Sequence, residues 1–309
     1  MKQAKVYLFL VLANLFWAGN FVFGALVVTQ ISPVSLTFSR WLCASVFLIP
    51  LAWLIERVSW KRALVEWRLH VVQSALGLVA YTLFLYWALG LTTPISAAVI
   101  SATNPAMIAL AAALFLGNKL GASRILGLVL SFAGVLVVLS GGSIARIIET
   151  GFNPGDLLVL GAVISWTAYS LVGRRFSTPP VTATAVQAVF AIVLMIPFVA
   201  AFGVQLPTDA SGFAGLAYIV LFPSLAAYAL WNSGVGAIGP ARAGIFLNLL
   251  PVFTVLISVL LGAELSLAVL LGGVLVLAGV YLTSRRPRAL AVTAMAPDAA
   301  TPGDGASKR

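Results

Sequence analysis

Side chains that carry out most enzyme chemistry are scarce in this sequence. The chain of 309 residues has one histidine, His70, and one cysteine, Cys43, too few for an ordinary metal site. The carboxylates before residue 287 lie at the ends of apolar stretches or between them: Glu56, Glu66, Glu149, Asp156, Asp209 and Glu264. No acid–base pair or Ser–His–Asp set can therefore form inside an apolar segment. We expect no catalytic residue, no metal and no cofactor, and hence no enzyme.

Aromatic residues within the apolar stretches indicate a different chemistry, the binding of an aromatic, apolar or cationic molecule. Trp17 and Trp166 lie in the middle of two such stretches, and Tyr81 and Tyr228 take similar places in two others. Tyr169 follows Trp166 on nearly the same helical face. Rings of this kind bind ligands by stacking and by cation–π contact. We predict that these five rings line a substrate cavity; the alternative is packing against the core or lipid.

Polar residues near two prolines extend the candidate site. Four of them lie within or near apolar stretches: Asn20, Ser101, Asn104 and Asn248. Pro105 and Pro251 leave the carbonyls of Ser101 and Leu247 without their usual helical partners. Free carbonyls beside these side chains can hold an ammonium or a carboxylate, so we predict that the four residues bind substrate. The alternative is hydrogen bonding between helices, which is common for Asn in membranes.

Arg40 is the only charge well inside an apolar stretch. It follows Pro33 by seven residues, which places it roughly 10 Å along a helix that rises 1.5 Å per residue. A charge at such a depth is costly and often functional. We predict a gating role or a polar contact with substrate; the alternative is that Arg40 snorkels or bonds loose carbonyls within the bundle.

The composition requires a membrane around these residues. The chain is 61% hydrophobic and 8% charged, with a mean hydropathy of +1.09, whereas soluble domains carry about 25% charged residues. A span takes about 20 residues, and only helices satisfy their own backbone in lipid. The predicted fold is an all-α integral membrane protein with ten transmembrane helices, at about 5–29, 33–55, 70–91, 94–117, 123–141, 155–173, 180–203, 212–235, 240–262 and 266–284.

The distribution of basic residues predicts the orientation. With the N-terminus inside, the one exterior basic residue is Arg146, whereas fourteen lie in the interior segments: Lys2, Lys5, Arg57, Lys61, Arg62, Arg68, Lys119, Arg124, Arg174, Arg175, Arg242, Arg285, Arg286 and Arg288. This asymmetry places both termini in the cytoplasm. It also explains the net charge of +10 without a nucleic-acid partner. The first stretch is expected to be an uncleaved span, because it is too long for a signal peptide.

The chain contains an internal repeat. Matching positions such as Pro33 and Pro180, Pro105 and Pro251, and Trp17 and Trp166 follow one another in unbroken order at offsets of 145 to 149 residues. Each copy holds five predicted spans, so the second copy enters the membrane in the opposite sense. Inverted repeats of this kind are typical of secondary transporters. We predict repeats over 1–146 and 147–286, and a disordered cytoplasmic tail over 287–309.

Several motifs resemble a known transporter family. Both halves end in spaced Leu-Gly and Ala-Gly-Val motifs, the run 16–21 reads Phe-Trp-Ala-Gly-Asn-Phe, and Pro105 and Pro251 fall in the fourth span of each half. Over residues 5–284 this pattern resembles the EamA-type exporters of the drug/metabolite transporter superfamily, most closely the YddG-type exporters of aromatic amino acids and methyl viologen. The resemblance implies a central cavity, with the fifth and tenth spans at the periphery. One departure is Asn118-Lys119 where the second half has Ala263-Glu264.

The resemblance and the residues together predict an exporter of small metabolites in a bacterial inner membrane. Its expected substrates are aromatic or bulky apolar amino acids. Because no carboxylate lies at mid-span, we expect alternating access with facilitated diffusion. The alternatives are a proton-coupled multidrug exporter and an exchanger of sugar phosphates or nucleotide sugars, which would need more cations than Arg40. A channel-like or scaffolding protein is a further alternative. The expected partners are the small-molecule substrate and membrane lipid, in a monomer or weak dimer.

Overall fold

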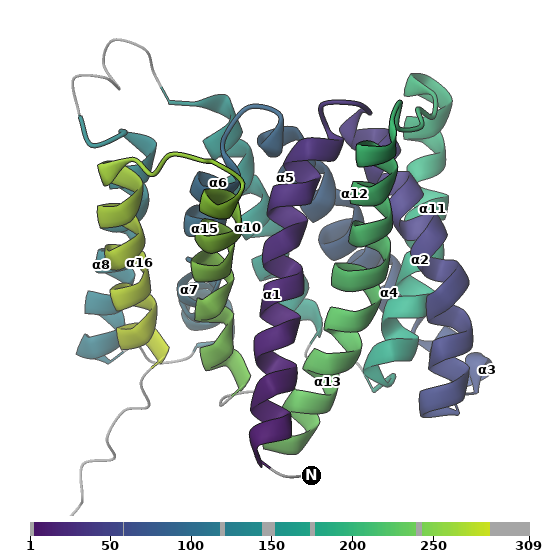
Figure 1. The fold of residues 1–309 in the computed structure, drawn as a ribbon. Coiled ribbons are helices and arrows are strands. Elements are labelled where there is room, and N and C mark those ends of the chain that lie inside the picture. The colour runs from purple at the N-terminus through teal and green to yellow at the C-terminus, as the bar shows by residue number, and fades with distance from the viewer. Residues whose placement is uncertain are drawn as a thin grey trace, which may run out of the picture.

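The computed structural model describes residues 3–57, 59–117, 121–143, 152–173, 177–238 and 243–284. All the secondary structure in these ranges is helical and forms one bundle (Figure 1). The elements are α1 (Gln3–Val27), α2 (Pro33–Glu56), α3 (Trp60–Val65), α4 (Trp67–Gln73), η1 (Ser74–Ala80), α5 (Tyr81–Leu89), α6 (Pro94–Ser101), α7 (Asn104–Leu116), α8 (Ala122–Leu139), α10 (Pro154–Val172), α11 (Pro180–Phe202), α12 (Ala210–Leu221), η3 (Phe222–Ala226), α13 (Ala227–Ile238), η4 (Gly244–Asn248), α15 (Leu249–Leu260) and α16 (Leu267–Ser284).

Among the described residues, eight helical stretches are long and apolar enough to cross a membrane. They correspond to the first eight predicted spans: Gln3–Val27, Pro33–Glu56, Trp67–Leu89, Pro94–Phe115, Ala122–Leu139, Pro154–Val172, Pro180–Phe202 and Ala210–Val235. Two shorter apolar helices, Phe246–Leu260 and Leu267–Thr283, occupy the last two predicted spans. The count of ten spans therefore stays a prediction. The predicted tail at 287–309 and the boundary between residues 146 and 147 lie outside the described residues.

Four of the long helices begin at a side-chain cap. The cap oxygen accepts a hydrogen bond from a backbone N–H of the first turn, and the capping residues are Ser32, Thr93, Asn153 and Asp209. After the first three of these caps comes a proline, which has no N–H to satisfy and a backbone angle suited to the first helical position. At each of these four helices, the capping residue and the residue after it mark the end of the connection and the start of the helix.

Several of the predicted spans are interrupted helices in the part of the chain that the structure describes. Ala102 and Thr103 separate α6 from α7, just before Pro105. The span that includes Pro223 consists of α12, the π-helical turn η3 and α13, and the span around Tyr81 consists of α4, the π-helical segment η1 and α5. Proline explains the first two interruptions, because its ring removes a backbone donor. Such irregular turns leave backbone carbonyls available to side chains of other helices.

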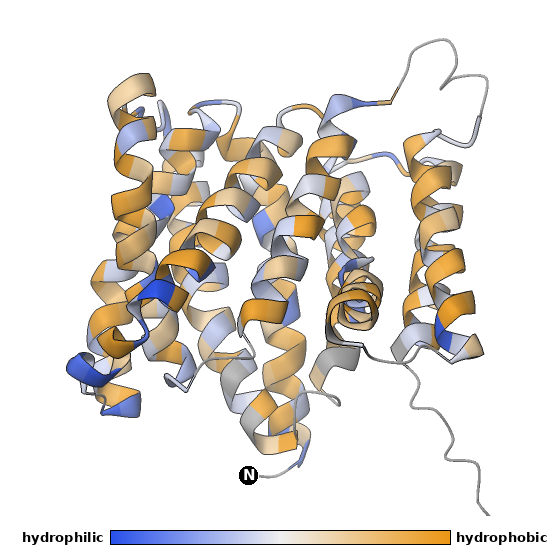
Figure 2. Cartoon of the chain, turned by 180° about the vertical axis from the view of Figure 1, so that it is seen from behind, coloured by the Kyte–Doolittle hydropathy of each residue, from blue (hydrophilic) through white to orange (hydrophobic). Residues whose placement is uncertain are grey.

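The helices pack in an order that leaves two pairs at opposite edges of the bundle. Helix α8 packs against α16 at one edge, α2 packs against α11 toward the other, and α1 lies between them (Figure 1). Apolar residues make up most of the helical ribbon (Figure 2). Many large apolar side chains are largely exposed on the outside of the bundle, including Val46 at 64% and Leu114 at 70%. Apolar faces of this extent suit contact with lipid rather than water.

Hydrogen bonds join the N-terminal and C-terminal halves at both ends of the α2–α11 pair. At one end the Glu56 carboxylate accepts from the backbone N–H groups of Val181 and Thr182, at 2.9 and 2.8 Å. At the other end the Gln205 side chain accepts from Ser32 N at 2.7 Å. Each contact satisfies backbone donors at the start of a helix that have no partner within it. Helices α2 and α11 are therefore joined to each other by hydrogen bonds at both ends.

Candidate functional site

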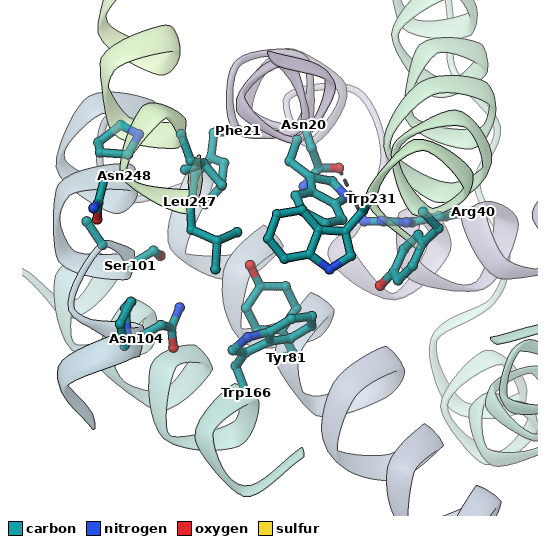
Figure 3. Close-up of a pocket in the computed structure, with 16 residues that line it drawn as sticks. Asn20, Phe21, Arg40, Tyr81, Ser101, Asn104, Trp166, Trp231, Leu247 and Asn248 are labelled. Atoms are coloured by element: carbon teal, nitrogen blue, oxygen red, sulfur yellow. Dashed lines mark hydrogen bonds between the residues drawn. The ribbon is translucent and has the colours of Figure 1, made fainter. Parts of the chain in front are cut away.

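A cavity of about 160 Å³ lies among the central helices. Its walls come from α1, α2, α5, α6, α7, α10, α13, η4 and α15 (Figure 3), whereas the edge helices α8 and α16 supply none of the lining residues. The lining residues are Trp17, Asn20, Phe21, Arg40, Tyr81, Ser101, Ala102, Asn104, Pro105, Trp166, Tyr228, Trp231, Leu247, Asn248, Leu250 and Pro251. A mostly apolar hollow with a few convergent polar groups is the usual form of a small-molecule site.

The structure brings most of the predicted site residues to this one cavity. Eight of the nine predicted substrate-binding residues line it, together with Arg40: Trp17, Asn20, Tyr81, Ser101, Asn104, Trp166, Tyr228 and Asn248. The exception is Tyr169, whose ring stacks on Trp166 at 4.9 Å and lies against Gly77. A residue three positions along a helix is rotated by about 60° from the first. This rotation turns Tyr169 away from the cavity that Trp166 faces.

Ring contacts hold the aromatic wall together. Trp17 lies edge-on to Tyr228 at 5.7 Å and contacts Trp231 at 5.4 Å. Trp166 contacts Tyr81 at 5.1 Å. The indole N–H of Trp17 also donates to the carbonyl of Pro223, in the irregular turn η3, at 3.1 Å. These contacts fix the orientation of the rings before any ligand is present.

Sequence reasoning missed part of the lining. Trp231 was not predicted; it follows Tyr228 by three residues, the same spacing that separates Tyr169 from Trp166, so spacing alone does not distinguish the two residues. Leu247 and Leu250 lie on either side of Asn248 and close the cavity with apolar surface. No signal in the sequence distinguishes these two leucines from the many others. They reach the cavity because η4 and α15 both pack against α1, and α15 also packs against α6.

Arg40 is buried at the side of the cavity, with 5% of its surface exposed. Its Nε donates to Ser224 Oγ at 2.9 Å, and its Nη1 donates to Tyr86 OH at 2.7 Å and to Asn20 Oδ1 at 3.2 Å. The Tyr86 hydroxyl in turn donates to Asn20 Oδ1 at 3.0 Å. The Trp41 ring lies 4.8 Å from the guanidinium carbon. Arg40 is thus held inside the bundle and does not snorkel to its edge.

A second polar group lies where α6 gives way to α7. The Ser101 hydroxyl and the Asn104 Oδ1 are buried and have no hydrogen-bond partner among the described residues. In Figure 3 these side chains lie across the cavity from Asn20 and Arg40, with Tyr81 and Trp166 between the two groups. Leaving a buried polar atom without a partner costs free energy. Both residues line the cavity, so a hydrogen-bond donor on a bound molecule would satisfy these oxygens once the side chains turn toward it.

Comparison with known families identifies the class of protein. The model of the EamA-like transporter family matches residues 4–140 and 153–285. The chain belongs to the EamA-like transporter family. It is accordingly a multi-pass membrane protein of a transporter family, as the apolar composition predicted, and the match covers most of both halves.

Individual relatives agree with this family and name no substrate. The transporter YyaM of Bacillus subtilis is 29% identical over 292 residues, which cover 92% of this chain and 95% of YyaM. A transporter of Archaeoglobus fulgidus is 29% identical over 295 residues, covering 92% of this chain and 99% of the relative. A crystal structure at 22% identity has the same fold, with a TM-score of 0.60 over 91% of this chain and 96% of that one.

Proposed function

We propose that this EamA-family transporter exports small metabolites, with aromatic or bulky apolar amino acids as its substrates. The observation that carries the proposal is the central cavity, where Trp17, Tyr81, Trp166 and Tyr228 form an aromatic wall. The aromatic ring of a substrate can stack on such a wall, and its transfer out of water costs little free energy. Small polar metabolites would gain much less from the same surface.

Contacts between the rings support an inverted repeat around this cavity. The sequence repeat equates Trp17 with Trp166 and Tyr228 with Tyr81. Trp17 contacts Tyr228, and Trp166 contacts Tyr81, so exchanging the two halves turns one contact into the other. A pseudo-twofold axis between two inverted halves requires this behaviour. In an alternating-access mechanism, this cavity between the halves would open first to one side of the membrane and then to the other.

The charges around the cavity favour facilitated diffusion. No carboxylate is among the lining residues, whereas proton-coupled transporters commonly use a carboxylate or histidine within the membrane. Arg40 is the one cation among the lining residues, and phosphorylated substrates are usually held by several Arg or Lys side chains. Proton-coupled multidrug export and exchange of sugar phosphates are therefore less well supported than passive transport of amino acids.

We place the protein in a bacterial inner membrane with both termini in the cytoplasm, as a monomer or weak dimer whose partners are its substrate and lipid. The start of α1 and the end of α16 lie at the same end of the bundle (Figure 1). This arrangement supports termini on one side, and the basic residues near those ends favour the cytoplasmic side.

Flux measurements in proteoliposomes test the function. Purified protein is reconstituted, and efflux of radiolabelled tryptophan, tyrosine, leucine and alanine is followed with and without an imposed pH gradient. We expect saturable efflux of the aromatic and bulky substrates down their own gradient, with little for alanine. Empty liposomes and an unrelated transporter of similar size serve as controls. Flux that requires a proton gradient would favour the proton-coupled alternative, and non-saturable flux would indicate a channel.

A further inference from the structure

The positive charge of Arg40 has no counter-ion in the part of the chain that the structure describes. Its described hydrogen-bond partners are the neutral groups of Ser224, Tyr86 and Asn20. With 5% exposure, the side chain is also largely withdrawn from water. Charges buried in proteins are normally paired, because desolvation of a lone charge is costly. The cavity thus retains an unbalanced positive charge.

Two donors beside this charge are unused. The guanidinium engages Nε and Nη1, and its Nη2 donates to none of the described residues. Asn20 Oδ1 accepts from both Arg40 and Tyr86, which fixes the direction of the amide. The Asn20 Nδ2 group has no acceptor among the described residues, and Asn20 lines the cavity as Arg40 does. Two N–H donors next to a positive charge match the two oxygens of a carboxylate.

The opposite side of the cavity offers acceptors instead. Ser101 Oγ and Asn104 Oδ1 are buried without a partner in the described structure. They lie beyond Tyr81 and Trp166 as seen from Arg40 (Figure 3). An unpaired amide oxygen is satisfied by a hydroxyl, an indole N–H or an ammonium. Between the two polar groups the cavity presents aromatic surface.

Building on the transport function proposed above, we infer that Arg40 and Asn20 bind the carboxylate of the substrate, while Ser101 and Asn104 accept a hydrogen bond from a donor at its far end. The ligand class is then a monocarboxylate with an aromatic body and a distal hydroxyl or N–H. Tyrosine is the simplest amino acid of this class. Phenylalanine lacks the distal donor, and tyramine lacks the carboxylate.

The first test compares ligands on the unmodified protein. Binding to purified transporter is measured by thermal stabilisation, with tyrosine, tyramine, phenylalanine and 3-(4-hydroxyphenyl)propanoate, which keeps the carboxylate and lacks the ammonium. Losing hydrogen bonds to a charged group weakens binding by at least about tenfold. We expect that penalty for tyramine, a weakening of about three- to tenfold for phenylalanine, and a dissociation constant for the propanoate within about threefold of tyrosine.

The second test separates the two polar groups by substitution. Arg40→Gln should bring the tyrosine-to-tyramine affinity ratio close to one while leaving the preference for tyrosine over phenylalanine. Asn104→Ala should do the reverse. Arg68→Gln, which removes an exposed arginine outside the cavity, should change neither ratio. Affinity ratios do not depend on how much protein folds, so a merely structural role would leave both ratios unchanged.

The possible results distinguish failure of the carboxylate assignment from failure of the proposed transport function. Equal binding of tyrosine and tyramine by the unmodified protein, or an unchanged ratio in a folded Arg40→Gln variant, would overturn the carboxylate assignment even if aromatic amino acids are transported. The absence of binding by any of the four compounds would overturn it as well. Selective binding of carboxylates without any flux would instead keep the assignment and refute the proposed transport function.

Discussion

Each tryptophan on the cavity wall is held by other rings. Trp17 lies against Tyr228 and Trp231, and Trp166 lies against Tyr81 and Tyr169. A ring already fixed in place loses little conformational entropy when a ligand stacks on it. The two indoles therefore form prepared surfaces for an aromatic substrate. Tyr169, which does not line the cavity, supports Trp166 from behind.

Removing either indole should weaken the binding of aromatic substrates. An aromatic pair contributes about 0.5–1.5 kcal/mol beyond the area it buries, so Trp17→Ala and Trp166→Ala should each raise the apparent Michaelis constant for tryptophan efflux by about two- to tenfold. Efflux of leucine should suffer less. Trp53→Ala is the matched control, since Trp53 is 62% exposed on the outer face of α2. Equal losses for every substrate would show that these rings act in gating or folding.

Single residues of the site were partly predictable. The mid-stretch aromatics and the asparagines beside prolines stood out, because such residues are unusual within apolar helices. The direction in which each ring points was not predictable, since helices such as α1 are apolar on all sides. Tyr169 and Trp231 illustrate this limit: each lies three residues from a lining ring, and only the packed structure shows that Trp231 faces the cavity.

Among the elements, α8 and α16 pack against each other through glycines. A Cβ added to Gly134 would lie 2.6 Å from the carbonyl oxygen of Gly272, and one added to Gly127 would lie 2.5 Å from that of Gly279. The repeat equates Gly127 with Gly272 and Gly134 with Gly279, so the two contacts exchange with the halves. Small residues at such crossings allow two backbones to touch in a membrane.

Adding a methyl group between these two helices should destabilise the protein without altering the cavity. Gly134→Ala forces the helices apart, and overpacking of this kind costs about 1–3 kcal/mol. We expect a lower midpoint of thermal unfolding in detergent, and an unchanged substrate affinity, because neither helix lines the cavity. Gly121→Ala is the control, since a Cβ there meets nothing within 4 Å. An unchanged midpoint for Gly134→Ala would contradict this account of the packing.

Glu66 ties the start of α4 to the segment before α11. Its carboxylate accepts hydrogen bonds from the backbone N–H groups of Ser177 and Thr178, both at 3.1 Å, and from their hydroxyls. The Thr178 hydroxyl contributes most to lowering the pKa of Glu66 from 4.5 to about 2, and the other three hydrogen bonds act in the same direction against partial burial. The ionised carboxylate is therefore stabilised in the folded protein.

This lowered pKa predicts a dependence of stability on pH. In the unfolded chain Glu66 takes up its proton near pH 4.5, whereas in the folded protein it stays ionised to about pH 2. Its stabilising contribution is thus complete above pH 4.5 and fades as the pH falls toward 2. The difference in thermal midpoint between the unmodified protein and Glu66→Gln should be constant from pH 7 to pH 5 and shrink below that. Glu264→Gln, with no hydrogen-bond partner in the described structure, is the control.

Helix starts were the most predictable feature at the scale of elements. Prolines and small polar caps mark the beginnings of α2, α6 and α10 in the sequence itself. The π-helical segment η1 was not predictable, because Ser74–Ala80 contains no proline and reads as an unbroken apolar helix. Its irregular backbone is used by other helices: the Leu78 carbonyl accepts from Trp41 Nε1 at 2.9 Å, and the Leu76 carbonyl accepts from Ser165 Oγ at 2.7 Å.

At the scale of the whole molecule, the connections between helices alternate between two ends of the bundle. Residue 57 and the segment 59–66 lie at the same end as the start of α1, and the connection from α11 to α12 lies at the opposite end (Figure 1). The former contains Arg57, Lys61 and Arg62, whereas the latter contains no basic residue. Basic residues concentrate on the cytoplasmic side of membrane proteins. The orientation of the whole protein can therefore be tested at these two connections.

Labelling from outside the cell tests that orientation. Cys43 is an exposed cysteine, so the background carries Cys43→Ser, and Arg62→Cys and Leu206→Cys are introduced separately. Leu206 is 64% exposed, and position 62 is likewise exposed. A membrane-impermeant maleimide applied to intact cells should modify position 206 and spare position 62, which should react only after the cells are permeabilised. Labelling of both positions from outside would contradict the five crossings predicted between them, and with them the inverted repeat. The opposite pattern would keep the repeat and reverse the proposed orientation, placing both termini outside.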